Sequence, residues 1–144
     1  MKLDYVTATS SDRSFFIHAH HKAYRDTIET MFGWNEVEQD EFAGRAFDQG
    51  GIKIICSDNQ RVGVVGWEQH PDHIWLKELF ILPSEQGHGV GSTVIQHIKA
   101  IAERRNLPVR LRTLKANLRA KALYERNGFT VSNQTDIHWN MVCL

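Results

Sequence analysis

The 144-residue sequence has no net charge at neutral pH and no long apolar run. Lysine plus arginine (17) equals aspartate plus glutamate (17), so no overall basic field attracts nucleic acid or an anionic lipid surface. No apolar stretch approaches the roughly 20 residues that span a bilayer. We therefore expect neither a nucleic-acid partner nor a membrane partner, and any bound anion must be held by local groups.

Cysteine is also scarce, with only Cys56 and Cys143, which lie far apart without metal-type spacing. Each falls in an apolar run, so we expect small buried hydrophobic side chains rather than a functional pair. The first residues, MKLDYVTATS, contain no apolar signal core. A reducing cytoplasm is the expected location, and the length suits one domain over residues 1–144.

Histidine is plentiful, and His18, His20 and His21 fall together in HAHH. On a helix His18 and His21 share a face, but the sequence pairs no carboxylate or cysteine with them in an obvious way. A zinc-binding helix has the pattern H-E-x-x-H, which is absent. We therefore expect a surface helix with ordinary histidines and no metal site.

Hydrophobic periodicity and turn residues divide the chain into alternating strands and helices. Ser11 and Asp12 begin a helix that ends at Gly33, and Asn35 caps a second helix that stops at Gly50. The expected strands are residues 2–9, 52–57, 61–70, 73–82, 109–113, 129–134 and 137–144. Two later helices are expected, one from the glycine segment to Arg105 and one over residues 117–128.

One part of this predicted order is a β-α-β crossover. Strand 74–82, the helix after it and strand 109–113 form the unit, so those two strands should be parallel neighbours. The other connections favour antiparallel pairing. The sequence therefore predicts a mixed α/β fold.

Three glycines, Gly87, Gly89 and Gly91, lie between a predicted strand and the start of the following helix. A glycine-rich turn removes side chains that would block a phosphate from the unpaired N–H groups of a helix start. No Lys-Ser/Thr follows the glycines, which excludes a Walker loop, and the G-x-G-x-G spacing differs from the Rossmann fingerprint. A pyrophosphate site and a turn without a ligand both remain open on this segment alone.

Two motifs together carry a family resemblance. The segment LFILPSEQGHGVG resembles the acyl-CoA signature Q/R-x-x-G-x-G/A of the GNAT superfamily of N-acetyltransferases, through Gln86, Gly89 and Gly91. Downstream, NLRAKALYERNGF is similar to the second family signature at Asn117, Ala120, Leu123, Tyr124, Gly128 and Phe129. The resemblance implies a mostly antiparallel central sheet of about seven strands flanked by about four helices, with a splay between strands 4 and 5.

The resemblance also implies acetyl-CoA as the acetyl donor and assigns residues to it. The pantetheine arm would pair with backbone groups of Leu79, Phe80 and Ile81 in the splay, and Asn117 and Tyr124 would contact it from the later helix. The pyrophosphate would meet the turn and helix start, which comprise Gln86, Gly87, His88, Gly89, Val90, Gly91 and Ser92.

Acetyl transfer to an amine needs a base for the amine and an acid for the departing thiolate. Tyr124 matches the family's acid position, and its alternative role is to pack against the pantetheine. Glu78 is the expected base. Two alternatives stay open: Glu78 could instead form a structural salt bridge with Lys53 or Arg112, or a water chain could act as the base. Neither cysteine lies near the expected acetyl position, which favours direct attack in a ternary complex.

The acceptor is expected to be a small-molecule primary amine. Its pocket would use Tyr24, Trp34, Trp67, Glu78 and His138, with Trp139 beside the last, because aromatic rings around an acidic group suit a small cationic amine. Trp67 could equally be a core residue. The alternatives are a protein N-terminus or lysine as acceptor, or a module that binds coenzyme A without transfer. A homodimer is left open.

Overall fold

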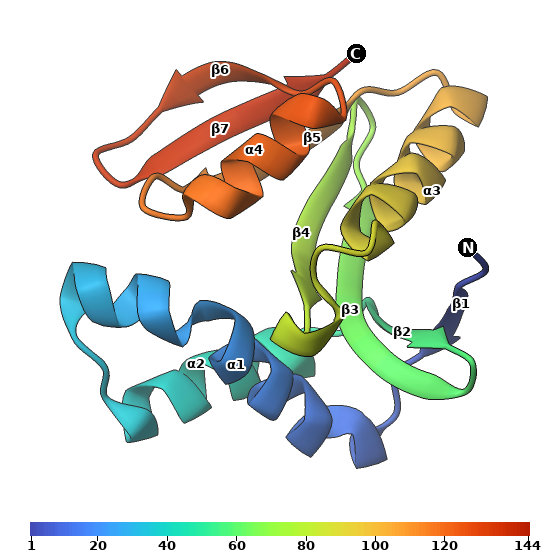
Figure 1. Cartoon of the computed structure of the whole chain (residues 1–144). Coiled ribbons are helices and arrows are strands. Elements are labelled where there is room, and N and C mark those ends of the chain that lie inside the picture. Colours follow the sequence, from blue (N-terminus) through green and yellow to red (C-terminus); the bar gives the residue numbers. More distant parts are fainter. The chain divides into compact units, whose positions relative to one another are not determined.

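The computed structural model describes residues 1–144 and has a mixed α/β fold, with four α-helices and seven strands (Figure 1). The elements follow the predicted order, with two short 3-10 turns, η1 and η2, added. Their bounds are β1 (Asp4–Thr7), η1 (Ser10–Asp12), α1 (Arg13–Phe32), α2 (Glu36–Asp48), β2 (Ile52–Ser57), β3 (Gln60–Gln69), β4 (Ile74–Ile81), η2 (Pro83–Glu85), α3 (Val90–Arg104), β5 (Val109–Leu114), α4 (Leu118–Arg126), β6 (Thr130–Gln134) and β7 (His138–Cys143).

The strands are hydrogen-bonded in the order β1-β2-β3-β4-β5-β7-β6. Strand β4 pairs with β5 in parallel, as the crossover rule predicts, whereas β1–β2, β2–β3, β5–β7 and β6–β7 are antiparallel. The parallel pairing joins only Ile74 to Val109 and Trp75 to Arg110, at the start of β4. The predicted mixed sheet, with a splay between strands 4 and 5, is therefore confirmed.

Several local signals read from the sequence set the element boundaries. Asp58 and Asn59 both have positive φ, 50° and 64°, in the two-residue turn between β2 and β3, as a tight hairpin requires. The Asn35 side chain accepts a hydrogen bond from the Glu38 amide at 3.0 Å and caps α2. Asn106, just after the end of α3, has a φ of 56°, in the left-handed conformation that often follows a helix. The first strand is shorter than predicted, because only Asp4–Thr7 pairs with β2.

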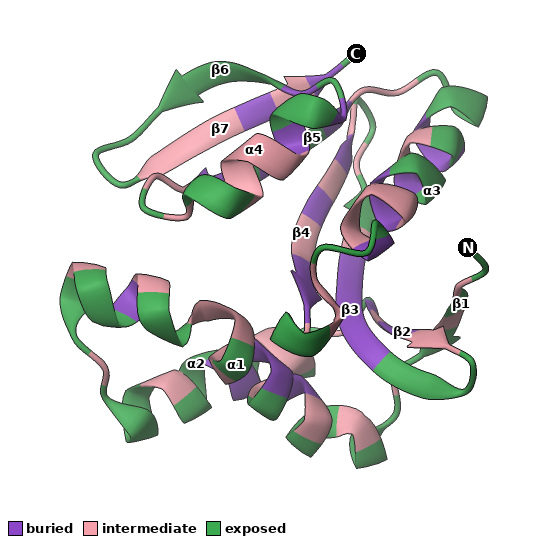
Figure 2. Cartoon of the chain, viewed as in Figure 1, coloured by how far each residue is buried: buried purple, intermediate pink, exposed green.

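The chain forms two compact units. The first contains residues 1–66 and 78–88. Its core joins one face of α1 and α2 to strands β2, β3 and the end of β4 (Figure 2). The Phe16 ring lies at its centre, edge-on to Phe47 at 5.4 Å and to Phe80 at 5.2 Å between ring centroids. The buried members are Phe16, Ala19, Ala43, Ile52, Ile54, Val64 and Phe80.

The second unit contains residues 67–77 and 89–144. Helix α3 contacts β5 and buries an apolar face that includes Val90, Val94, Ile98 and Ile101. Strand β5 alternates between buried and exposed side chains, with Val109, Leu111 and Thr113 inside. None of the helices combines the length and apolar character needed to cross a membrane.

Candidate functional site

The turn before α3 is shaped by glycine conformation and by one side chain. Gly87 and Gly89 have φ of 81° and 83°, in the left-handed region that L-residues with a Cβ avoid. The Gln86 side chain donates a hydrogen bond to the Ile81 carbonyl at 2.9 Å and ties the turn to the end of β4. His88 is exposed. The first two glycines therefore meet a conformational need of the backbone.

Gly91 serves a different purpose. It lies inside α3, and a Cβ there would come within 3.0 Å of Cδ2 of Leu123 on α4. The absence of a side chain thus lets the two helices approach closely. At Gly89, by contrast, nothing lies within 4 Å of a Cβ. The three glycines were predicted to act alike, but only Gly87 and Gly89 belong to the turn itself.

The N-terminus of α3 is left without a side-chain cap. Gly89 occupies the cap position, and its carbonyl accepts the Thr93 amide at 3.0 Å and the Thr93 hydroxyl at 2.9 Å. The amides of Val90, Gly91 and Ser92 precede the first intrahelical donor. A helix start of this kind carries about half a positive charge and suits an anion.

Helix α4 presents the second predicted pair. The Asn117 side chain accepts a hydrogen bond from the Ala120 amide at 3.1 Å, so its oxygen caps the helix. Tyr124, two turns later, is buried and stands edge-on to Phe129 at 5.7 Å between centroids. Asn117 therefore caps α4, and its contact with a cofactor stays a prediction.

Sequence reasoning missed Asn127, which joins α4 to the first turns of α3. Its side chain is buried, donates to the Ser92 hydroxyl at 3.1 Å and the Leu123 carbonyl at 2.8 Å, and accepts from Gln96 at 2.9 Å. Lys99 donates to its backbone carbonyl at 2.8 Å. Its position just before the Gly128-Phe129 of the second signature could have drawn attention to it.

The end of β4 carries the residues predicted to face the acetyl group. Leu79, Phe80 and Ile81 are buried, and Glu78 is half-buried. Glu78 lies beside β3, where a Cβ on Gly66 would be 3.4 Å from the Glu78 Cβ. The Leu82 amide donates to the Val62 carbonyl at 2.9 Å and fixes this end of β4 against β3.

Tyr24 and Trp34 come from α1 and from the loop after it. The Tyr24 hydroxyl donates to the Leu79 carbonyl at 3.3 Å, and its ring lies 5.6 Å from Phe80. The Trp34 ring lies 4.9 Å from the His21 ring, with the Arg25 guanidinium 5.1 Å above it. The structure thus brings Tyr24 to the stretch of β4 that was predicted to pair with the cofactor, and the acceptor pocket itself stays a prediction.

The other two predicted pocket residues belong to the second unit. Trp67 is half-buried with the Arg105 guanidinium 5.5 Å from its ring, so it also packs within that unit. His138 is half-buried on β7, and burial together with the nearby Arg112 lowers its pKa. The neighbouring Trp139 has the ammonium groups of Lys115 at 4.6 Å and Lys121 at 5.2 Å from its ring.

The expectation of ordinary surface histidines on α1 is wrong for two of the three. His20 is only 3% exposed, and burial, with a smaller effect from His21, lowers its pKa to about 4. His21 has a carboxylate partner that the sequence did not suggest, because its Nε2 lies 2.6 Å from Oδ1 of Asp40. The partner comes from α2, so sequence spacing along α1 could not show it.

A glycine turn that opens onto an uncapped helix, in a chain with this strand order, is the arrangement that the GNAT resemblance implies. The family model described as the acetyltransferase (GNAT) family matches residues 15–129, and the chain belongs to that family. The comparison with curated proteins found no match.

Solved structures of the same fold are distant in sequence. The PaiA N-acetyltransferase from Thermoplasma acidophilum, in complex with coenzyme A, is 15% identical with a TM-score of 0.79 over 99% of both chains. The ribosomal-protein-S18-alanine N-acetyltransferase from Escherichia coli is 19% identical with a TM-score of 0.71, over 99% of this chain and 93% of that one. Arabidopsis thaliana Naa50, in complex with the bisubstrate analogue CoA-Ac-MVNAL, is 14% identical with a TM-score of 0.69, over 100% and 99%.

Proposed function

We propose that this protein is an N-acetyltransferase that moves the acetyl group of acetyl-CoA to a primary amine on a small molecule. The observation that carries the proposal is the turn before α3, where Gly87 and Gly89 hold positive φ and no side chain caps the helix. That arrangement suits a pyrophosphate, in a chain whose family transfers acetyl groups.

Acetyl-CoA would be held by two sets of backbone groups. The amides from Gln86 to Ser92 bind the pyrophosphate, and the backbone of Leu79, Phe80 and Ile81 pairs with the pantetheine. Asn117 contacts the pantetheine arm. The Thermoplasma acetyltransferase is complexed with coenzyme A and Arabidopsis Naa50 with the bisubstrate analogue CoA-Ac-MVNAL, and both complexes support a cofactor of this kind.

The reaction needs two protons removed from the acceptor nitrogen and one supplied to the departing sulfur. Glu78 takes the first proton from the acceptor ammonium, directly or through water, and the free amine attacks the thioester carbonyl in a ternary complex. The carbon–sulfur bond then breaks, Tyr124 gives its phenolic proton to the thiolate, and the nitrogen gives its second proton to the phenolate so that Tyr124 is restored. A phenol suits this step because its ordinary pKa near 10 keeps it protonated at neutral pH.

The acceptor is proposed to be small because aromatic side chains stand beside the reacting end of β4. The Tyr24 hydroxyl bonds to the Leu79 carbonyl, and the Tyr24 ring packs near Phe80. Rings of this kind favour a compact cationic amine. The runner-up acceptor is a protein N-terminus, which is favoured by the likeness to the ribosomal-protein-S18-alanine N-acetyltransferase and to Naa50 in complex with CoA-Ac-MVNAL.

The test is a panel of acceptors with acetyl-CoA and detection of the released thiol. The panel should contain small polyamines and aromatic amines alongside peptides with free N-termini and internal lysines. Turnover of small amines and not of peptides supports the proposal. Peptide turnover alone would replace it with the runner-up, and coenzyme A binding without any turnover would indicate a binding module.

A further inference from the structure

The geometry of α1 and α2 points to a second, metal-binding site. We propose that His21, Glu36 and Asp40 bind a divalent transition-metal ion, with Zn²⁺ as the best match. The His21 Nε2, one Glu36 oxygen and one Asp40 oxygen lie within 4.8 Å of one another. No step of the proposed acetyl transfer uses this group, so the two proposals stand independently.

The distances require only small movements to accept an ion. Nε2 of His21 lies 2.6 Å from Oδ1 of Asp40 and 4.0 Å from Oε1 of Glu36. Zinc bonds of about 2.0–2.2 Å in a tetrahedral site put neighbouring ligand atoms about 3.3 Å apart, so each of these two pairs would shift by less than about 1 Å. The Glu36 and Asp40 oxygens, which lie within 4.8 Å of one another, would shift by at most about 1.5 Å. The carboxylates are 60% and 51% exposed at Glu36 and Asp40, so they can adjust cheaply, whereas His21 is 14% exposed and fixed.

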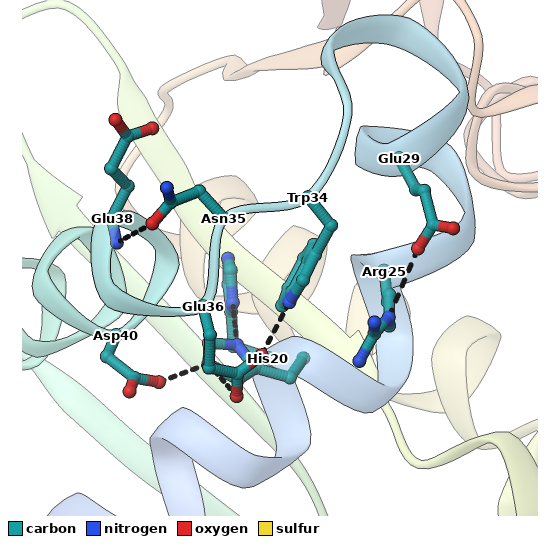
Figure 3. Close-up of polar contacts among 9 residues, drawn as sticks. His20, Arg25, Glu29, Trp34, Asn35, Glu36, Glu38 and Asp40 are labelled. Atoms are coloured by element: carbon teal, nitrogen blue, oxygen red, sulfur yellow. Dashed lines mark hydrogen bonds and ion pairs between the residues drawn. The ribbon is translucent and has the colours of Figure 1, made fainter.

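Two of the three proposed ligands, His21 and Glu36, are already oriented by neighbouring side chains. Nδ1 of His20 lies 3.0 Å from Nδ1 of His21, and the indole N–H of Trp34 donates to Oε2 of Glu36 at 2.6 Å (Figure 3). A metal-bound histidine ordinarily donates its other ring N–H to an acceptor, and a ligating carboxylate is ordinarily hydrogen-bonded in turn. His20 and Trp34 fill both of these positions from outside the ligand set.

The buried His20 is suited to the acceptor role. It is 3% exposed and packs its ring against Tyr24 at 5.2 Å and Phe80 at 6.0 Å between centroids, so its position beside His21 is fixed. With a metal on Nε2 of His21, the Nδ1 proton of that ring would be donated to Nδ1 of His20, 3.0 Å away.

The ligand set selects the class of ion. An imidazole with two carboxylates suits zinc and its first-row neighbours, whereas Ca²⁺ and Mg²⁺ prefer all-oxygen sites. Two acidic side chains supply the negative charge that a dication requires. Three protein ligands leave at least one position for water. The ion would also link α1 to α2 across the loop that contains Trp34.

The experiment is calorimetric titration of the untagged full chain, stripped with EDTA, with ZnCl₂ and separately with MgCl₂. We expect one zinc ion per chain, no magnesium binding, and a zinc-dependent rise in thermal midpoint by mass action. His21→Asn and Asp40→Asn should each weaken zinc binding by about 10-fold to 100-fold or more. Asp40→Asn keeps the shape of an exposed side chain, so its fold should be intact by circular dichroism.

Matched controls lie close in the sequence. His18→Asn removes an exposed histidine of the same helix, Glu38→Gln an exposed carboxylate of α2, and His73→Asn a histidine paired with Asp72 elsewhere. Each should leave the zinc affinity within about twofold. Three results would each overturn the proposal and leave a simple His21–Asp40 hydrogen bond. They are an unchanged zinc affinity in His21→Asn and Asp40→Asn, a loss of affinity confined to the His73 variant, and no zinc binding at all.

Discussion

The pyrophosphate hypothesis makes a sharp prediction at Gly89, the cap residue of α3. We compare Gly89→Asp with Gly89→Asn, two side chains of nearly equal shape that differ in charge. Gly89 has a φ of 83°, and a Cβ there meets nothing within 4 Å. Both replacements therefore cost only the left-handed backbone conformation, about 1 kcal/mol, which asparagine and aspartate tolerate better than other residues.

The charge of the aspartate separates the two variants. A carboxylate about 5 Å from one phosphate charge, at an effective dielectric constant of about 20, repels it by about 3 kcal/mol. That energy corresponds to about a 10²-fold loss in affinity. The aspartate charge also interacts favourably with the positive N-terminal end of the α3 dipole, which stabilises the folded state by about 0.3–1 kcal/mol. Gly89→Asp should therefore be at least as stable as Gly89→Asn.

The assay is calorimetric titration with coenzyme A and, separately, with pantetheine, alongside thermal unfolding of each variant. Gly89→Asn should bind coenzyme A somewhat more weakly than the natural chain, and Gly89→Asp about 10²-fold more weakly than Gly89→Asn. Pantetheine, which lacks the pyrophosphate, should not distinguish the variants. Equal coenzyme A affinities for the two folded variants would refute an anion site at this turn.

Four further predictions concern single residues. Glu78→Gln should lower kcat/KM by about 10²–10⁴, with a smaller loss at high pH where free amine is abundant, and an equal loss at every pH would indicate a structural role. Tyr124→Phe should lower kcat about 10-fold to 10²-fold in single-turnover assays while acetyl-CoA affinity holds, and unchanged chemistry would exclude the acid role. Asn127→Ala should lower the free energy of unfolding in urea by about 2–3 kcal/mol, because it removes the hydrogen bonds of the Asn127 side chain to Ser92, Leu123 and Gln96. The control Asn133→Ala, at an exposed position, should change the free energy of unfolding little. Because the pKa of His20 is lowered to about 4, the unfolded chain takes up the proton first. Stability in EDTA should therefore be unaffected by this group above about pH 6.5 and fall by up to about 3 kcal/mol toward pH 4, a loss absent from His20→Leu.

Local signals in the sequence predicted the fold well because each has a short-range cause. The cap oxygens of Asn35 and Asn117 sit three residues before the amides they accept, at 3.0 Å and 3.1 Å. The Asp58-Asn59 turn and the left-handed Asn106 follow from residues that tolerate positive φ. Elements defined by such features were placed to within a few residues.

Features that depend on two distant segments could not be predicted in this way. His21 meets Asp40 across two helices, nineteen positions away along the chain. Asn127 binds Ser92 and Gln96 from another element, and His20 is buried because aromatic rings from α2 and β4 surround it. Periodicity along one helix reports which face is apolar, but not which side chain arrives opposite a given position.

The three glycines show how the same residue type can hide separate causes. Gly87 and Gly89 are needed for backbone conformation, since φ near 80° is strained for any side chain. Gly91 is needed for packing, since a Cβ would press on Leu123 at 3.0 Å. Leu123 lies in α4 directly before Tyr124, and its carbonyl accepts a hydrogen bond from the Asn127 side chain. The spacing G-x-G-x-G therefore combines a turn that exposes helix amides with a contact that fixes α4 against α3, and a sequence motif of this kind records both requirements at once.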